Sequence, residues 1–78
     1  MKAVVWSKPN CPYCVMAKKL LETKGYDIDE RVIGFGWNAE QLFEAVPNAK
    51  TVPQIFLDNE YVGGYDNLVA HFKAKEQA

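Results

Sequence analysis

The chain has 78 residues, of which 49% are hydrophobic and 24% are charged, and its 9 basic and 10 acidic side chains give a formal net charge of -1. A chain of this length forms one domain, expected to span residues 1–78, and buries only roughly 60–65% of its unfolded surface. The near-neutral charge excludes a broad positive field, so nucleic acid is not an expected partner. No apolar stretch approaches the roughly 20 residues that cross a bilayer, so a membrane is not expected either.

The first predicted unit is a strand, a helix and a second strand. Residues 3–6 form an apolar run that ends in the loop 7–10, which is typical of a buried strand. A helix is predicted from Pro12 to Lys24, because apolar residues recur at spacings of three and four and Gly25 is a suitable C-terminal cap. Residues 26–33 form a second strand, parallel to the first because a helix joins them in a crossover. The apolar positions of the helix are Tyr13, Ala17, Leu20 and Leu21, and its lysines, Lys18, Lys19 and Lys24, are interpreted as a solvated face.

A short second helix follows the loop 34–37. Asn38 is a plausible N-terminal cap for a helix from Ala39 to about Val46, and Pro47 ends it. The predicted inner side of this helix consists of Leu42, Phe43 and Val46. Within the preceding loop, Phe35 and Trp37 are interpreted as packing residues or as an exposed protein-docking patch.

The last third of the chain predicts a hairpin and a final helix. Residues 54–57 and 61–62 have the character of strands, and the turn-forming residues 58–60 join them. Gly63-Gly64 ends the hairpin, and a helix is predicted from Tyr65 to about Lys75. The buried stripe of this helix is predicted to be Leu68, Val69 and Phe72. The residues expected in the core are Leu20, Leu42, Ile55, Phe56, Leu68 and Phe72.

The predicted order of elements is therefore β-α-β-α-β-β-α. An order that begins with βαβ and ends with a hairpin and a helix predicts an α/β fold in which a mixed four-stranded sheet packs with three helices. The two cysteines would then lie at the carboxyl end of the first strand, where open α/β sheets usually present ligand sites.

Cys11 and Cys14 are the only cysteines, and they enclose two residues at the start of the first helix. This spacing lets Cys14 fold back within disulfide reach of Cys11. At a helix N-terminus Cys11 faces unpaired backbone amides, and Lys8 adds a cation, so the pKa of Cys11 is expected to fall. We expect Cys11 to be the exposed nucleophile, and Cys14, one turn into the helix, to be the more buried thiol that resolves a mixed disulfide.

Redox chemistry is favoured over the two other uses of such a cysteine pair. The apolar run at residues 3–6 is too short for a secretory signal, so a cytoplasmic protein is expected, in which a permanent structural disulfide is unusual. A structural zinc site needs four ligands, whereas this chain offers only Cys11, Cys14 and the distant His71. His71 is interpreted as a helix-surface residue.

Three separated motifs resemble those of the glutaredoxins, small members of the thioredoxin fold. They are Lys8-Pro9-Asn10-Cys11-Pro12-Tyr13-Cys14, Thr51-Val52-Pro53 and Gly63-Gly64-Tyr65-Asp66, in the order and approximate separations of that family. The resemblance covers nearly all of the chain and implies a thioredoxin-like fold. It also implies glutathione-dependent reduction of glutathionyl mixed disulfides and protein disulfides, with glutathione as the reductant and no metal.

The resemblance further implies a glutathione site. A cis peptide bond between Val52 and Pro53 would expose the backbone of Val52, with which the cysteinyl part of glutathione pairs like an added strand. Small residues at 63–64 permit close approach, the amides of the last helix hold the γ-glutamyl carboxylate, and Asp66 accepts from its ammonium group. The glutathione-binding residues expected on this basis are Lys8, Tyr13, Thr51, Val52, Pro53, Gly64, Tyr65 and Asp66.

Two parts of this expected site are less closely specified. The glycyl carboxylate of glutathione needs a cation or a donor, for which Lys8 is the first candidate and Gln41 and Lys50 are weaker ones. Asn67 stands where the family often has a second acidic residue, so an amide contact replaces a charged one. Tyr13 is interpreted as a wall of the pocket.

The expected partners are glutathione and disulfide-containing or glutathionylated proteins, with ribonucleotide reductase as a candidate acceptor by family similarity and a monomeric state. Two alternatives remain. One is a thioredoxin-like donor reduced by a flavoprotein reductase, against which Thr51 and the 63–66 motif argue. The other is an iron-sulfur carrier in which two subunits share a cluster through Cys11 and glutathione; Pro12 and Cys14 disfavour it by analogy with dithiol family members.

Overall fold

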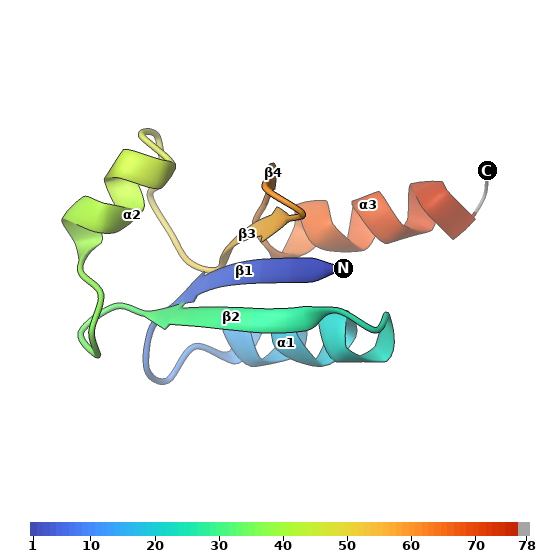
Figure 1. Ribbon diagram of the computed structural model, residues 1–78, viewed down its shortest axis with the longest axis horizontal. Coiled ribbons are helices and arrows are strands. Elements are labelled where there is room, and N and C mark those ends of the chain that lie inside the picture. The colour runs from blue at the N-terminus through green and yellow to red at the C-terminus, as the bar shows by residue number, and fades with distance from the viewer. Residues whose placement is uncertain (77–78) are drawn as a thin grey trace.

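The computed structural model describes residues 1–76 and confirms the predicted order of elements (Figure 1). The elements are β1 (Lys2–Ser7), α1 (Pro12–Thr23), β2 (Asp27–Val32), α2 (Ala39–Ala45), β3 (Gln54–Leu57), β4 (Glu60–Gly63) and α3 (Tyr65–Glu76). The four strands form one sheet in the order β2-β1-β3-β4, with β1 parallel to β2 and antiparallel to β3, which pairs antiparallel with β4. The predicted α/β fold with a mixed sheet and three helices is therefore confirmed.

The main core lies between the sheet and the helices α1 and α3. Successive side chains of a strand point to opposite faces, so Ala3 and Val5 of β1 share one face, and both are fully buried there. The buried residues of this cluster are Ala3, Val5, Ala17, Leu21, Ile55, Leu57, Leu68 and Phe72. Leu20, one of the predicted core residues, is only partly buried and packs against its edge.

The second core cluster forms on the opposite face, where Trp6 of β1 contacts residues of α2 and its flanking loops. Its buried members are Trp6, Leu42, Val46 and Ala49, with Phe56 partly buried against them. Phe43, predicted on the inner side of α2, is 47% exposed, so that prediction is wrong. A helix of only seven residues reaches this cluster through Leu42, and Val46 at its C-terminal cap completes the contact. Helix α2 lies at one end of the sheet, apart from α1 and α3 (Figure 1).

The loop before α2 separates its two aromatic residues. The ring of Trp37 meets that of Trp6 edge to face at 5.3 Å between centroids, and the guanidinium of Arg31 lies 4.5 Å from the Trp37 ring. Trp37 is therefore a packing residue. Phe35, in contrast, is 69% exposed.

Local sequence signals explain where the helices begin and end. Pro12 occupies the first position of α1, where no backbone donor is needed, and Gly25 follows its end with a φ of 81°. Asn38 caps α2 in a capping box with Gln41, whose side chain accepts from the Asn38 amide. None of the helices in the described part of the chain is both long and apolar enough to span a membrane.

Candidate active site

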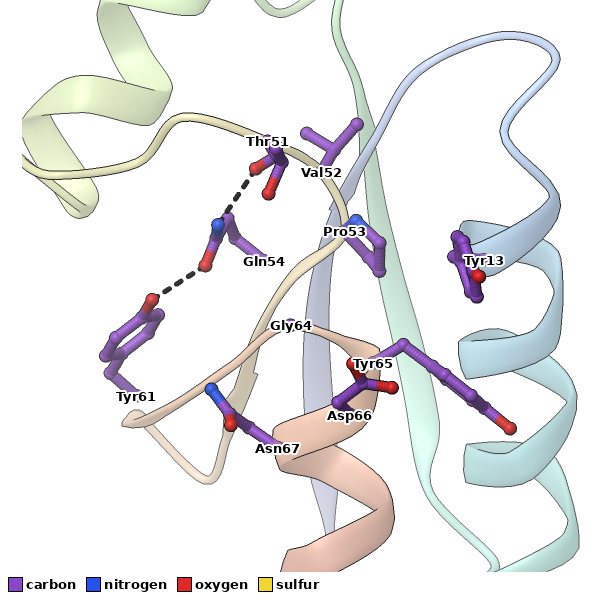
Figure 2. A pocket seen from close by; sticks show the side chains of 10 residues that line it. All are labelled: Tyr13, Thr51, Val52, Pro53, Gln54, Tyr61, Gly64, Tyr65, Asp66 and Asn67. Carbon is purple, nitrogen blue, oxygen red and sulfur yellow. Dashed lines mark hydrogen bonds between the residues drawn. The ribbon is translucent and has the colours of Figure 1, made fainter.

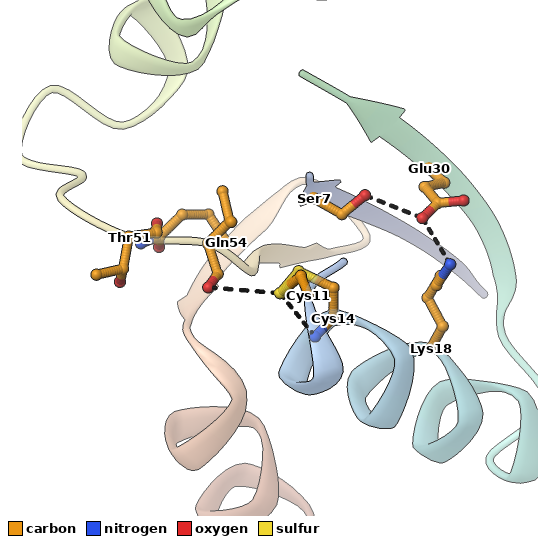
Figure 3. Close-up of a disulfide and its surroundings, with 8 residues drawn as sticks. Ser7, Cys11, Cys14, Lys18, Glu30, Thr51 and Gln54 are labelled. Carbon is orange, nitrogen blue, oxygen red and sulfur yellow. Dashed lines mark hydrogen bonds and ion pairs between the residues drawn. A yellow bond between two sulfur atoms is a disulfide. The ribbon is translucent and has the colours of Figure 1, made fainter. Parts of the chain in front are cut away.

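The two cysteines lie where β1 ends and α1 begins, and the structure joins them in a disulfide with 5.2 Å between their Cα atoms. Cys11 is the N-cap residue of α1, with an extended backbone, and Cys14 lies in the first turn. The Cys14 amide donates to the Sγ atom of Cys11 at 3.2 Å (Figure 3). After reduction, this amide and the positive end of α1 both favour a negative charge on the Cys11 sulfur.

Cys14 is more buried than Cys11, as predicted, but the difference between them is small. Cys11 is 7% exposed and Cys14 is 2% exposed. The expectation of an exposed Cys11 side chain is therefore wrong for the disulfide-bonded protein. The reason is a neighbouring loop, because the Cys11 Sγ atom lies 4.0 Å from the carbonyl oxygen of Val52.

The loop that covers Cys11 contains the predicted cis peptide bond between Val52 and Pro53, which the structure confirms. A chain of side-chain hydrogen bonds fixes this loop (Figure 2). The hydroxyl of Tyr61 donates to Gln54 Oε1 at 2.7 Å, and Gln54 Nε2 donates to the carbonyl oxygen of Thr51 at 2.8 Å. Because Gln54 is only 6% exposed, these two hydrogen bonds hold the loop from the interior of the protein.

A groove of about 550 Å³ runs beside this loop and brings together residues from three parts of the chain. All the predicted glutathione-binding residues except Lys8 line it, namely Tyr13, Thr51, Val52, Pro53, Gly64, Tyr65 and Asp66. Asn67, expected to offer an amide contact, also lines the groove, whereas two further lining residues, Gln54 and Tyr61, were not predicted as ligand contacts. In the sequence, Gln54 was placed only at the start of a strand, and no motif marked it as a ligand contact.

The wall of the groove is aromatic on one side and polar on the other. The rings of Tyr13 and Tyr65 lie 5.9 Å apart between centroids, and Tyr13 is 59% exposed, so it does not belong to the buried face of α1. Asp66 lies in the first turn of α3. A side chain at Gly64 would lie against the carbonyl oxygen of Pro53, at 3.6 Å for the first carbon atom. The N-terminus of α3 and the covering loop therefore approach each other closely.

The predicted contacts for the glycyl carboxylate lie outside this groove. Lys8 lines a neighbouring pocket together with Lys50, and Thr51 and Val52 belong to both the groove and that pocket. The side chain of Gln41 accepts from the Asn38 amide at 2.9 Å and is engaged in capping α2. Lys8 and Lys50 are therefore the cations next to the covering loop.

A charged cluster lies on the other side of the disulfide (Figure 3). The carboxylate of Glu30 accepts from the Lys18 ammonium at 2.6 Å and from the Ser7 hydroxyl at 2.9 Å, both at Oε2. The Lys18 and Ser7 hydrogen bonds lower the pKa of Glu30, although partial burial opposes this. Lys18 is partly exposed, as the interpretation of a solvated face allows, but its ammonium is also paired with Glu30.

His71 does not approach the disulfide. It lies on α3, and its ring packs at 5.4 Å from that of Phe72. Its Nε2 atom is buried and has no hydrogen-bond partner within the described residues. His71 is therefore more buried than predicted, since it was interpreted as a helix-surface residue. Among residues 1–76, no three His, Cys, Asp or Glu side chains are grouped as metal ligands.

Comparisons with known proteins agree with this geometry. A family model described as Glutaredoxin matches residues 3–62. Glutaredoxin 3 of Escherichia coli (strain K12) is 41% identical over 68 residues, covering 85% of this chain and 80% of that protein. Hybrid peroxiredoxin hyPrx5 of Haemophilus influenzae is 37% identical over 68 residues, and the match covers 87% of this chain but only 28% of that protein.

A solved structure shows the same fold. The crystal structure of a buckwheat glutaredoxin-glutathione complex matches with a TM-score of 0.80 and 25% identity, covering 94% of this chain and 69% of that one. A cysteine pair at a helix N-terminus, beside a cis-proline loop, has the geometry for thiol-disulfide exchange. The protein is a thiol-disulfide oxidoreductase, and its chain belongs to the glutaredoxin family.

Proposed function

We propose that the protein uses glutathione to reduce glutathionyl mixed disulfides and protein disulfides. The observation that carries this proposal is the groove, in which Tyr13, the segment 51–53 and the segment 64–66 meet beside Cys11. Its volume of about 550 Å³ falls within the range of small-molecule sites, roughly 300–1,000 Å³. The match to a buckwheat glutaredoxin whose structure is a glutathione complex adds support.

Each part of glutathione has a chemically suitable neighbour in this arrangement. The backbone of Val52 can pair with the cysteinyl unit, which brings the glutathione sulfur to the Cys11 side of the groove. The amides at the start of α3 suit the γ-glutamyl carboxylate, and Asp66 suits its ammonium group. The glycyl carboxylate would then extend toward Lys8 and Lys50, which line the adjoining pocket.

The proposed reduction of a glutathionyl mixed disulfide uses only Cys11. Its thiolate attacks the glutathionyl sulfur, a bond forms between Cys11 and glutathione, and the substrate leaves as a thiolate that takes a proton. The thiolate of a second glutathione then attacks this mixed disulfide. Glutathione disulfide is released, and the Cys11 thiolate is regenerated.

The proposed reduction of a protein disulfide uses both cysteines. Cys11 attacks first and forms a mixed disulfide with the substrate, and the Cys14 thiolate then attacks Cys11 and releases the reduced substrate. The product is the Cys11–Cys14 disulfide, which is the state of the protein in this structure. Two glutathione molecules would return the pair to the dithiol. We also propose ribonucleotide reductase as an acceptor, a monomeric state and a cytoplasmic location.

A reductant-exchange assay tests the glutathione dependence. The protein would be supplied with a glutathionylated peptide and NADPH, together with either glutathione and glutathione reductase or thioredoxin reductase alone. Turnover with the first system is expected, because the groove has residues suited to each part of the tripeptide. Turnover only with the second would overturn the proposal and favour a thioredoxin-like donor.

Two further measurements bear on the same assignment. When the reduced protein is mixed with the glutathionylated peptide, mass spectrometry should find a glutathione adduct on Cys11. Anaerobic reconstitution with iron and sulfide should leave a colourless monomer. A stable coloured dimer without peptide reduction would instead favour the iron-sulfur carrier.

A further inference from the structure

A second pocket opens on the side of the disulfide that faces away from the groove. Both cysteines line this pocket, whereas neither is among the residues that line the groove. Its wall also contains three charged residues, Lys8, Lys18 and Glu30. None of the steps proposed above uses Lys18 or Glu30.

The sheet register explains why these charges gather there. Val5 of β1 is paired with Glu30 of β2, and alternation along the strands places Ser7 and Glu30 on the face that carries α1. Lys18 lies four residues after Cys14 on α1, so the two side chains lie on the same face of that helix. The ammonium of Lys18 and the carboxylate of Glu30 then meet at 2.6 Å.

The cluster is anchored from inside the protein. Ser7 is 1% exposed, and its hydroxyl donates to the same Glu30 oxygen that binds Lys18. The side chains of Lys18 and Glu30 remain 28% and 33% exposed, so they stay in contact with solvent while their positions are fixed. The Ser7 hydroxyl fixes the position of the Glu30 carboxylate, and through it that of the Lys18 ammonium. It therefore sets where both charges lie relative to the pocket, in addition to linking α1 to the sheet.

We propose that Lys18 and Glu30 are positioning residues for Cys14: the Lys18 ammonium stabilises the Cys14 thiolate, and Glu30, oriented by Ser7, partly neutralises that ammonium and so limits its effect. The inference rests on the proposed role of Cys14 as the resolving thiol. The pair would thus control how readily Cys14 attacks the mixed disulfide at Cys11.

Cys14 has other charged and titratable neighbours besides Lys18 and Glu30. Lys8, from the loop before α1, lines the same pocket and favours the thiolate as well. On the groove side the titratable groups are Tyr13, Tyr61, Tyr65 and Asp66. Cys14 is 2% exposed, and burial without a counter-charge raises the pKa of a thiol, so a nearby ammonium has an effect on it.

The chemical step is a proton loss followed by thiol-disulfide exchange. The Cys14 thiol releases its proton to water in the pocket, and the thiolate attacks the Cys11 sulfur of the mixed disulfide. The Cys11–Cys14 bond forms as the bond between Cys11 and the substrate breaks, and the substrate leaves as a thiolate. Removal of a positive charge from the pocket should therefore slow this step, and removal of a negative charge should accelerate it.

The test measures the pKa of Cys14 through the pH dependence of its alkylation by iodoacetamide, in a Cys11→Ser background where Cys14 is the only thiol. Lys18→Gln should raise the pKa and slow alkylation at neutral pH by roughly two- to fivefold, the range expected for a partly exposed charge. Glu30→Gln should lower the pKa. Lys18→Arg keeps the charge and should leave the pKa of Cys14 at its wild-type value. Lys19→Gln removes an exposed lysine outside the pocket and should also leave this pKa unchanged.

The opposite signs distinguish the proposal from a purely structural role. If Lys18→Gln and Glu30→Gln shift the pKa in the same direction, or no more than Lys19→Gln does, the pair only links α1 to β2 and the proposal is overturned. Circular dichroism of each variant checks that the fold is kept, and Glu30→Gln gives a second reading if Lys18→Gln unfolds. The measurement needs no glutathione and no protein substrate, so it can fail while the proposed function stands, and the reverse also holds.

Discussion

The two sides of the disulfide are built in different ways. On the groove side, the ligand surface comes from the loop 51–53, the start of α3 and the aromatic ring of Tyr13. On the pocket side, the surface comes from the loop before α1, the first half of α1 and strand β2, and its main feature is the ion pair of Lys18 and Glu30. Backbone groups, aromatic rings and a single carboxylate, that of Asp66, suit recognition of a tripeptide, whereas an anchored ion pair suits control of a proton.

In the proposed function, this division lets one dithiol serve two substrates. In this proposal, the groove holds glutathione next to Cys11 without involving Lys18 and Glu30 on the far side. The pocket can adjust Cys14 without changing the groove. Substitutions on each side should therefore affect different reactions, and the following experiments separate them.

Cys11→Ser should produce the largest loss. Cys11 is the nucleophile of both proposed routes, and a serine hydroxyl in its place is not ionised at neutral pH. Reduction of the glutathionylated peptide and of a protein disulfide should both fall by on the order of 10³ or more, measured with glutathione and glutathione reductase. Substantial turnover in either assay would show that the nucleophile is misassigned.

Cys14→Ser should divide the two activities. Reduction of the glutathionylated peptide should be largely retained, because the mixed disulfide at Cys11 is resolved by a second glutathione. Reduction of a protein disulfide should be strongly impaired, because the substrate mixed disulfide cannot be resolved from within. Equal loss in both assays would contradict the separation of the groove from the pocket.

The parts of this molecule that were predictable depend on local sequence signals. Pro12 at the first turn of α1 and Asn38 at the start of α2 mark those helices, and the apolar repeats mark the strands and the main core. Seven of the ten groove residues were predictable because each belongs to a short motif of the glutaredoxin family. The cis bond at Pro53 was also expected from that resemblance rather than from the residues alone.

The features that escaped prediction depend on the sheet register. The approach of Ser7 to Glu30 requires the pairing of β1 with β2, and that of Tyr61 to Gln54 requires the pairing of β3 with β4. No local pattern contains these distances. Phe43 was misplaced for a similar reason, since the side that α2 buries is decided by how the loops orient it against Trp6.

Tyr61→Phe should affect only the groove side, and moderately. The change removes the hydroxyl that donates to Gln54 and so loosens the carbonyl of Thr51 in the covering loop. A net hydrogen bond contributes about 0.5–1.5 kcal/mol, so the KM for the glutathionylated peptide should rise roughly two- to tenfold while kcat stays near wild type. Tyr26→Phe, which removes a hydroxyl from a residue packed against the main core, is the matched control. An unchanged KM would mean that the loop keeps its position without Tyr61.

Glu30→Gln should give the smallest effect, a pH-dependent change in stability confined to the pocket side. Lys18 and Ser7 lower the pKa of Glu30 from its ordinary value of 4.5, so its carboxylate stabilises the fold above that value, and this contribution is lost as the pH falls through the lowered pKa. Since the ion pair is partly exposed, urea unfolding at pH 7 should show a loss of less than about 1 kcal/mol, which added salt reduces further.

The pH dependence identifies the source of that small difference. At pH values well below 4.5 the wild-type carboxyl is also neutral, so the wild-type and Glu30→Gln proteins should converge in unfolding free energy. Glu44→Gln, which removes an exposed carboxylate from α2, should not reproduce this convergence. A difference that persists unchanged in acid would arise from packing of the Glu30 side chain. The pocket would then lack the charge interaction that distinguishes it from the groove.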